Sequence, residues 1–159
     1  MPKYPAFETF SRNAKRSLVY AQQEAEDGPD YYIGTEHILL GLFRTGEGSA
    51  YRALQYLGVD ELKIRHECER LRRDRKPGPY PEQIIPTTRV RDLVVRAAEE
   101  ANRTQSKNVR SGHLLAGLIL EGTGLAAHML KAQGIDAEHV VAAVERELKE
   151  GEPDGVQPR

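Results

Sequence analysis

The chain contains an internal duplication, and no other feature of the sequence constrains the fold as strongly. Moving the sequence along itself by 76 residues aligns His37 with His113 without a gap. The same register pairs glycines at positions 41, 46, 48 and 58 with glycines at 117, 122, 124 and 134. Because chance does not maintain one register over such a span, the chain is two copies of one structural unit.

Apolar residues recur in each copy at the spacing of an α-helix. In the first copy, Ala14, Leu18, Ala21 and Ala25 follow Ser11, a residue suited to capping. Further helices are expected after Thr35, over residues 50–57 and after Asp60, and in the second copy over 90–102, 111–120, 125–133 and 136–149. No alternating apolar pattern favours a sheet. The sequence predicts an all-α fold of eight helices, as two tandem four-helix repeats related by a pseudo-twofold axis.

The two repeats are separated by a segment that is rich in proline. We expect repeat 1 at residues 7–75, a linker at 76–86, repeat 2 at 87–150 and a flexible tail at 151–159. Prolines at 77, 79, 81 and 86 favour an extended, stiff linker. Each repeat alone is small for burying its apolar faces, so we expect the two to pack together as one compact domain.

Composition excludes several classes of partner. The formal net charge is −1, so no overall field attracts nucleic acid or an anionic membrane. The basic run at residues 69–76 is short and mixed with acidic residues, which favours a solvated helix end. A single cysteine fits a reducing compartment. The first residues lack the apolar core of a signal peptide. No apolar run reaches the roughly 20 residues that a membrane-spanning helix needs. We expect a monomeric cytoplasmic protein that binds neither nucleic acid nor membrane.

Three motifs resemble a known family: "FETFS" at residues 7–11, "YIGTEHILLGL" at 32–42 and "GEGSAYRALQYLGV" at 46–59. They are similar to the amino-terminal domain of ClpC-type Hsp100 unfoldases, the double Clp-N motif, over about residues 7–150. The resemblance implies a domain that receives adaptor proteins and, in some members, substrates tagged with phosphoarginine. No G-x-x-x-x-G-K-[ST] loop occurs here, which implies the receptor without the ATPase motor. The segments at 1–7 and 155–159 favour a stand-alone protein over a fragment.

The resemblance also implies a phosphoarginine pocket in each half. In the family, a glutamate holds the guanidinium group and a hydroxyl residue lies near the phosphate. Carried over by position, the first pocket comprises Ser11, Thr35 and Glu36. A carboxylate can accept two parallel N–H bonds from a guanidinium, and helix starts suit a phosphoryl group.

The second pocket, carried over in the same way, comprises Thr87, Ser111 and Gly112. Gly112 stands where the first copy has Glu36, so the guanidinium would lose a hydrogen bond worth roughly 1.5–3 kcal/mol. We interpret the second pocket as degenerate and expect at most one competent site. On this hypothesis, replacing Gly112 with glutamate strengthens the second pocket.

Structural roles compete with these binding roles. Ser11, Thr35, Thr87 and Ser111 are all placed as helix N-caps, and the capping role is favoured for each hydroxyl. Glu36 in a first helical turn also suits the helix dipole, so ligand binding and dipole compensation stay open for it.

Two phenylalanines match aromatic positions that, in the family, lie near a groove used by adaptors and by cyclic-peptide antibiotics. The second copy has Gln83 and Pro86 at the corresponding places, so the other aromatic wall is lost. Phe10 is predicted as a core residue, and Phe7 as the better candidate for exposure.

Catalytic and metal-binding readings receive little support. His37 and His113 lie in different halves without a second ligand four residues on, so capping or burial is favoured over a metal site. Cys68 falls on an apolar stripe and is predicted to be an inert core thiol. We predict no enzyme, no cofactor and no metal.

The favoured hypothesis is a non-catalytic module of the Clp protease system that binds Clp adaptors or phosphoarginine-tagged substrates. Without a motor, such a module would sequester these ligands or compete for them. The alternative is a regulatory or chaperone-like subunit that associates directly with a Clp ATPase or peptidase.

Overall fold

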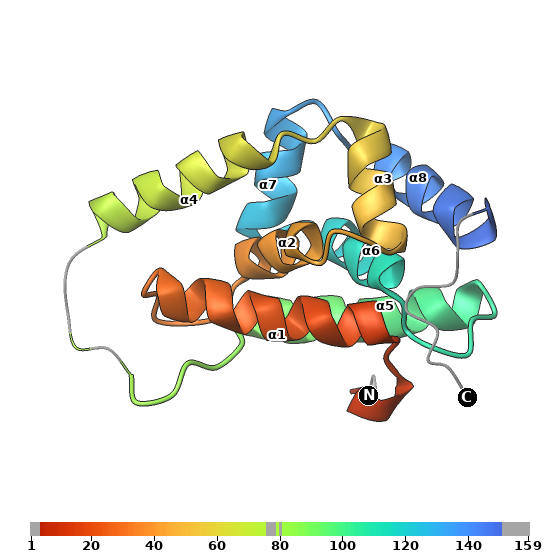
Figure 1. Cartoon of the computed structure of the whole chain (residues 1–159), viewed down its shortest axis with the longest axis horizontal. Helices are drawn as coiled ribbons and strands as arrows, with labels where there is room; N and C mark the ends of the chain where they lie inside the picture. Colours follow the sequence, from red (N-terminus) through yellow and green to blue (C-terminus); the bar gives the residue numbers. More distant parts are fainter. Residues whose placement is uncertain (1–3, 76–78, 80, 151–159) are drawn as a thin grey trace.

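The structure, a computed structural model, describes residues 4–75, 79 and 81–150 (Figure 1). This part of the chain contains a short 3-10 helix and eight α-helices: η1 (Phe7–Thr9), α1 (Arg12–Asp27), α2 (Thr35–Arg44), α3 (Ser49–Leu57), α4 (Glu61–Asp74), α5 (Thr88–Arg103), α6 (Ser111–Glu121), α7 (Leu125–Ala132) and α8 (Ala137–Glu150). The same residues contain no β-strand, and their only β-type pairing is in two isolated bridges, Phe10 with Val109 and Ile33 with Pro86. The all-α prediction is confirmed. The predicted tail at 151–159 lies outside the described residues, as do parts of the linker.

The helix ends follow the predicted local signals. Ser11 and Thr87 are the N-caps of α1 and α5, and their hydroxyls accept hydrogen bonds from Ala14 N and Val90 N. Asp60 caps α4 in the same way. Gly58 ends α3 in the left-handed conformation at φ 70°, as expected for a C-terminal cap.

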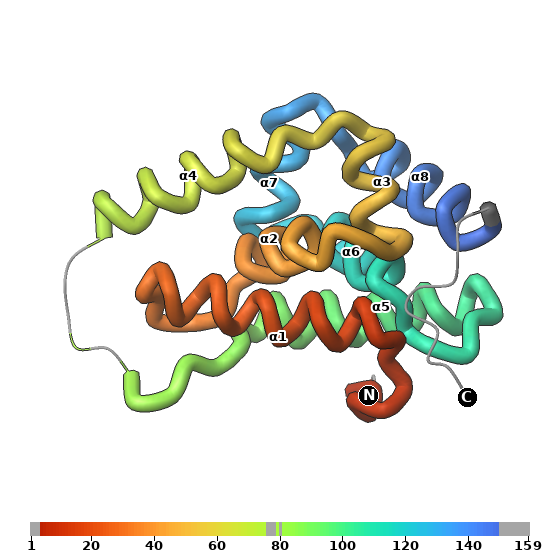
Figure 2. The backbone as a smooth tube through the Cα atoms, viewed as in Figure 1, coloured from red at the N-terminus to blue at the C-terminus, as the bar shows by residue number. Residues whose placement is uncertain are grey.

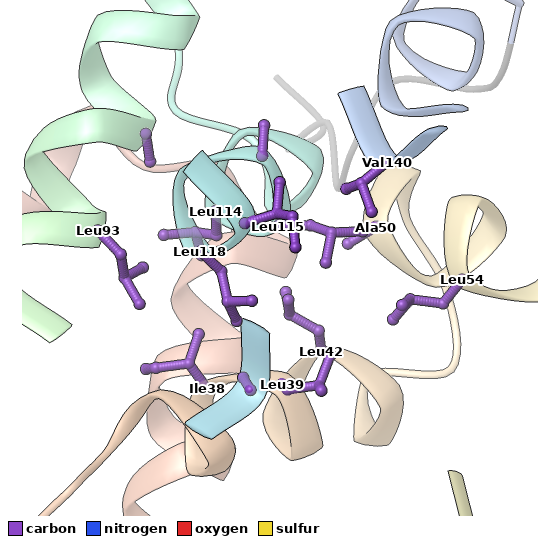
Figure 3. Close-up of a cluster of buried hydrophobic side chains, with 14 of the residues drawn as sticks. Ile38, Leu39, Leu42, Ala50, Leu54, Leu93, Leu114, Leu115, Leu118 and Val140 are labelled. Atoms are coloured by element: carbon purple, nitrogen blue, oxygen red, sulfur yellow. The ribbon is translucent and has the colours of Figure 1, made fainter. Parts of the chain in front are cut away.

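The centre of the molecule is formed by α2 and α6, which are buried along almost their whole length. Each packs most extensively on the first helix of its own repeat, α2 on α1 and α6 on α5. In Figure 1, α1 and α5 lie below this central pair, and α3, α7 and α8 lie above it. Leucines from α2, α3, α5 and α6 converge on one core, so the two repeats share an interior as predicted (Figure 3).

Glycines allow α1 and α2, and likewise α5 and α6, to approach closely. A Cβ on Gly41 would lie 2.3 Å from Ser17 O, and a Cβ on Gly117 would lie 2.4 Å from Leu93 O. These glycines are partners in the duplication, so the same helix crossing is built twice.

The bridges join the repeats crosswise. Ser11 N donates to Val109 O at 2.8 Å, which brings the start of α1 to the start of α6. Thr87 N donates to Ile33 O at 3.0 Å, which brings the start of α5 to the start of α2. Each half therefore positions a helix start of the other half.

The pseudo-twofold symmetry is broken at the fourth helix of each repeat. α8 packs extensively on α3 and α6, whereas α4 makes few contacts with α2 (Figure 2). No single described helix is both long and apolar enough to cross a bilayer. α6 and α7 satisfy the length and composition only together, across a bend of 88°.

Candidate functional site

The predicted pocket residues Ser11 and Glu36 do not lie together. Ser11 begins α1, whose 16 residues span about 24 Å. Glu36 follows the short loop that leaves the far end of α1. The grouping of Ser11 with Glu36 in one pocket is therefore corrected, because α1 separates them.

Thr87 and Ser111 are separated in the same manner by α5. The crosswise bridges instead pair the start of α2 with the start of α5, and the start of α6 with the start of α1. The residues that the structure brings to one end of the molecule are Thr35, Glu36 and Thr87. The other end has Ser11, Ser111 and Gly112.

The hydroxyls of Thr35 and Ser111 cap helices of the opposite repeat. Thr35 Oγ1 accepts a hydrogen bond from Ala126 N at 3.2 Å, at the start of α7. Ser111 Oγ accepts one from Ala50 N at 3.1 Å, at the start of α3. Both hydroxyl residues are buried.

The N-caps of α2 and α6 are Gly34 and Arg110, so the prediction that Thr35 and Ser111 cap their own helices is wrong. The sequence could not show this role, because the capped helix lies in the other repeat.

Glu36 is a buried acid on the first turn of α2, with 8% of its surface exposed. Its carboxylate folds back over Gly34, because a Cβ on Gly34 would lie 2.2 Å from Glu36 Oε1. Among the described residues, none forms a hydrogen bond or an ion pair with this carboxylate. Gly34 directly follows Ile33, whose carbonyl binds Thr87 N. The backbone just before Glu36 is therefore held against the start of α5.

The negative charge of Glu36 contributes to raised pKa values of two neighbouring side chains, Cys68 and Tyr32. Burial raises the pKa of the Cys68 thiol to about 12, and the negative charge of Glu36 adds to the effect. Burial likewise raises the pKa of Tyr32, again assisted by Glu36. Cys68 is buried on α4, as predicted for a core thiol, and its raised pKa disfavours the reactive thiolate.

Gly112 occupies the position of Glu36 in the second repeat, and packing explains the difference. A Cβ on Gly112 would lie 2.7 Å from Ser49 Oγ and 3.1 Å from Val144 Cγ1. Gly112 N also donates to Ser49 Oγ at 2.8 Å. A side chain at residue 112 would therefore need Ser49 on α3 and Val144 on α8 to shift, which argues against the expectation that a glutamate there strengthens a second pocket.

The paired histidines have matching structural roles. The Nδ1 atoms of His37 and His113 accept hydrogen bonds at 2.9 Å from Gly34 N and Arg110 N. Nε2 of His37 bonds Asp30 Oδ2 at 2.7 Å, and Nε2 of His113 bonds Thr104 Oγ1 at 2.9 Å. Both rings are fully engaged, which confirms the capping interpretation.

Asp30 is the centre of a buried ionic cluster that sequence reasoning missed. Its carboxylate, 5% exposed, bonds His37, Arg72 Nη2 at 2.8 Å and Arg75 Nη1 at 2.7 Å. Burial alone would raise the pKa of Asp30, but these hydrogen bonds hold it well below its ordinary value. The cluster fastens the end of α4 to the loop between α1 and α2. A signal was present, since Asp30 replaces an uncharged serine, Ser106, in the second repeat.

Phe10 and Phe7 differ in solvent exposure as predicted. Phe10 is 4% exposed and Phe7 is 52% exposed, with their ring centroids 5.9 Å apart. Lys15 Nζ lies 5.5 Å from the Phe7 ring. Binding of an adaptor or a cyclic peptide at this surface stays a prediction. Among the described His, Cys, Asp and Glu side chains, no group of three is placed to hold a metal ion.

Comparisons with known proteins cover nearly the whole chain. The family model described as the Clp repeat (R) N-terminal domain matches twice, at residues 9–83 and 85–158. The chain is 42% identical over 130 residues to the chaperone protein ClpB of Oceanobacillus iheyensis. It is 40% identical over 129 residues to the negative regulator of genetic competence ClpC/MecB of Bacillus subtilis. Each match covers 81% of this chain but only 16% of the relative.

Solved structures show the same fold. The N-terminal domain of Hsp104 from Candida albicans superposes with a TM-score of 0.73 at 15% identity, covering 91% of this chain and 93% of that domain. A complex of the ClpV N-domain with a VipB peptide gives 0.67 at 13% identity, with coverage of 87% and 88%. At such identities the likeness concerns the fold alone.

Proposed function

The chain belongs to the Clp repeat (R) N-terminal domain family, and from this premise we propose that it is a non-catalytic binding module of the Clp protease system. Its ligands are Clp adaptors or proteins tagged with phosphoarginine. We propose further that it sequesters these ligands or competes for them with a Clp ATPase. We propose a cytoplasmic location for this role.

The observation that carries the proposal is the environment of Glu36. Only 8% of Glu36 is exposed, its carboxylate oxygens keep some contact with solvent, and no described residue forms a hydrogen bond or ion pair with them. A solvent-accessible carboxylate without a protein partner is available to a cationic ligand group. A guanidinium satisfies a carboxylate with two parallel hydrogen bonds.

A phosphoryl group is favoured beside it by the start of α5. This helix is 16 residues long, and its first turn presents backbone N–H groups and the positive end of the helix dipole. Thr88 and Arg89 in that turn are exposed. A phosphoarginine side chain can therefore span from Glu36 to the α5 start, which belongs to the other repeat.

The relatives support protein binding in general terms. The ClpV N-domain, a neighbour in fold, is described in complex with a VipB peptide. The relatives of higher identity are named as chaperones and regulators, and this chain corresponds to 16% of their length.

Calorimetric titration of a phosphoarginine peptide into the full chain tests the proposal. Glu36→Gln removes the charge with little change in shape and is expected to weaken binding by roughly tenfold or more, since charged hydrogen bonds contribute about 1.5–3 kcal/mol. The control is Glu26→Gln, which neutralises an exposed glutamate on α1 and should leave the affinity unchanged.

Equal affinities for the two variants would refute the Glu36 assignment. Absence of binding by the wild type, together with co-elution of the chain with a purified Clp ATPase or peptidase, would favour the alternative of a regulatory subunit.

A further inference from the structure

The duplication makes α4 and α8 counterparts, yet the two helices are attached to the molecule by different interactions. α8 has three buried apolar residues, Val140, Ala143 and Val144, and it packs extensively on α3 and α6. α4 has two buried residues, Ile64 and Cys68, and makes few contacts with α2. Burial of apolar surface therefore stabilises the position of α4 less than that of α8.

The sequences of the two helices explain this difference. In the repeat register, Arg65 and Arg72 on α4 correspond to Val141 and Leu148 on α8. Val141 and Leu148 are partly buried and pack against the apolar core. Two positions that add apolar packing to α8 are thus occupied by charged residues on α4.

The arginines of α4 bind two acids of α1 and the loop that follows it. Arg65 Nη1 lies 3.0 Å from Glu24 Oε1, and Arg72 Nη2 lies 2.8 Å from Asp30 Oδ2. The side chains of Arg65 and Arg72 are 35% and 23% exposed. Ion pairs that water can reach stabilise a structure less than buried apolar contacts do, so this attachment is weaker than the attachment of α8.

The start of α4 is fastened separately. Gln133 Oε1 accepts a hydrogen bond from Asp60 N at 2.8 Å, and Gln133 Nε2 donates to Asp60 O at 3.1 Å. Figure 1 shows α4 running from this point away from α7 toward the edge of the molecule. α4 is therefore held at its start by backbone hydrogen bonds and farther along by its ion pairs.

We propose that α4 opens as a unit while the rest of the fold stays intact, pivoting at Asp60. Its ion pairs to α1 and to the following loop break, and Ile64 and Cys68 become exposed to solvent. The arginines of α4 set how often the helix opens. α8, which is held by apolar packing, stays closed under the same conditions.

Alkylation of Cys68 by iodoacetamide in the full chain measures this opening. Cys68 is the only cysteine of the chain and is 5% exposed, so the reagent reaches it only when α4 moves or the protein unfolds. The rate is expected to be at least about tenfold higher than global unfolding allows. It should also change little with urea below the unfolding transition, because a local opening exposes little surface. A rate that follows global unfolding at every urea concentration would overturn the proposal.

Hydrogen exchange of the unmodified chain gives a second measurement. The amides in the middle of α4 are expected to exchange at least about tenfold faster than those in the middle of α8, its counterpart. The amides of α6 should be as protected as those of α8, because α6 lies in the core. Equal protection of α4 and α8 would contradict a separate opening of α4.

A matched pair of variants tests the role of the ion pairs. Arg72→Gln removes the charged hydrogen bonds to Asp30 and should raise the alkylation rate of Cys68 roughly tenfold. Arg73→Gln removes the charge of the neighbouring, exposed arginine and should change the rate less than about twofold. Neither position is buried, so both variants should fold. Equal alkylation rates in the two variants would show that the Arg72 ion pair does not control the opening.

Discussion

Replacing Gly112 with glutamate separates the two explanations of why only one repeat has an acid at this position. If the acid is simply missing, the variant gains a second binding site. If the glycine is required by packing, the variant loses stability. The structure favours the second outcome, because a Cβ on residue 112 would lie 2.7 Å from Ser49 Oγ and 3.1 Å from Val144 Cγ1.

The magnitude follows from three local costs. The Cβ would lie 2.7 Å from Ser49 Oγ, and overpacking of this kind costs about 1–3 kcal/mol. Rotating the serine away breaks its hydrogen bond to Gly112 N, worth about 1 kcal/mol. Burying a carboxylate without a partner adds several kcal/mol more, while the gain in helix propensity over glycine is below about 1 kcal/mol.

We therefore expect Gly112→Glu to lower the free energy of unfolding by at least about 3 kcal/mol, a large share of the roughly 5–15 kcal/mol typical of domains. Urea denaturation followed by circular dichroism measures it. Glu36→Gly is the mirror-image control and should cost no more than about 1 kcal/mol, mainly from propensity. A Gly112→Glu protein as stable as the wild type would refute the packing argument.

Three further predictions concern the shared framework. Gly117→Ala should destabilise by about 1–3 kcal/mol in urea denaturation, since its Cβ would meet Leu93 O, and a neutral result would contradict the crossing geometry. Ser111→Ala should cost about 1 kcal/mol and weaken hydrogen-exchange protection at the start of α3 rather than α6, because its hydroxyl caps Ala50. Asp30→Asn should cost about 3–5 kcal/mol at pH 7. The folded protein holds the pKa of Asp30 below its ordinary value of 3.8. The wild type is therefore more stable than the variant above pH 3.8, and this difference in stability is lost as the pH falls through the folded-state pKa. A stability difference that persists in strong acid would contradict the assignment.

The helices and several of their caps could be predicted because their causes are local. Apolar spacing, the duplicated register and capping residues such as Ser11, Asp60 and Gly58 all act within a few residues of the structure they specify. The shared core of the two repeats could be predicted because each repeat alone is too small to bury its apolar faces.

The composition of the site could not be predicted in the same way, because it depends on contacts between distant segments. Ser11 and Glu36 lie in one repeat, yet the direction of α1 and α2 carries them to opposite ends. The bridge of Ile33 to Pro86 then supplies Thr87 from the second repeat as the neighbour of Glu36. The glycine at 112 was interpreted as a lost ligand, whereas the structure places Ser49 and Val144 against this position.

We propose that the complete ligand site combines the start of α2 with the start of α5. An amide-resolved NMR titration with phosphoarginine tests this arrangement, because amides at the two ends of the molecule report separately. We expect shifts at Glu36, Thr87 and Thr88, with little change at Ser11 and Gly112. Shifts centred on Ser11 and Gly112, with Glu36 unaffected, would contradict it.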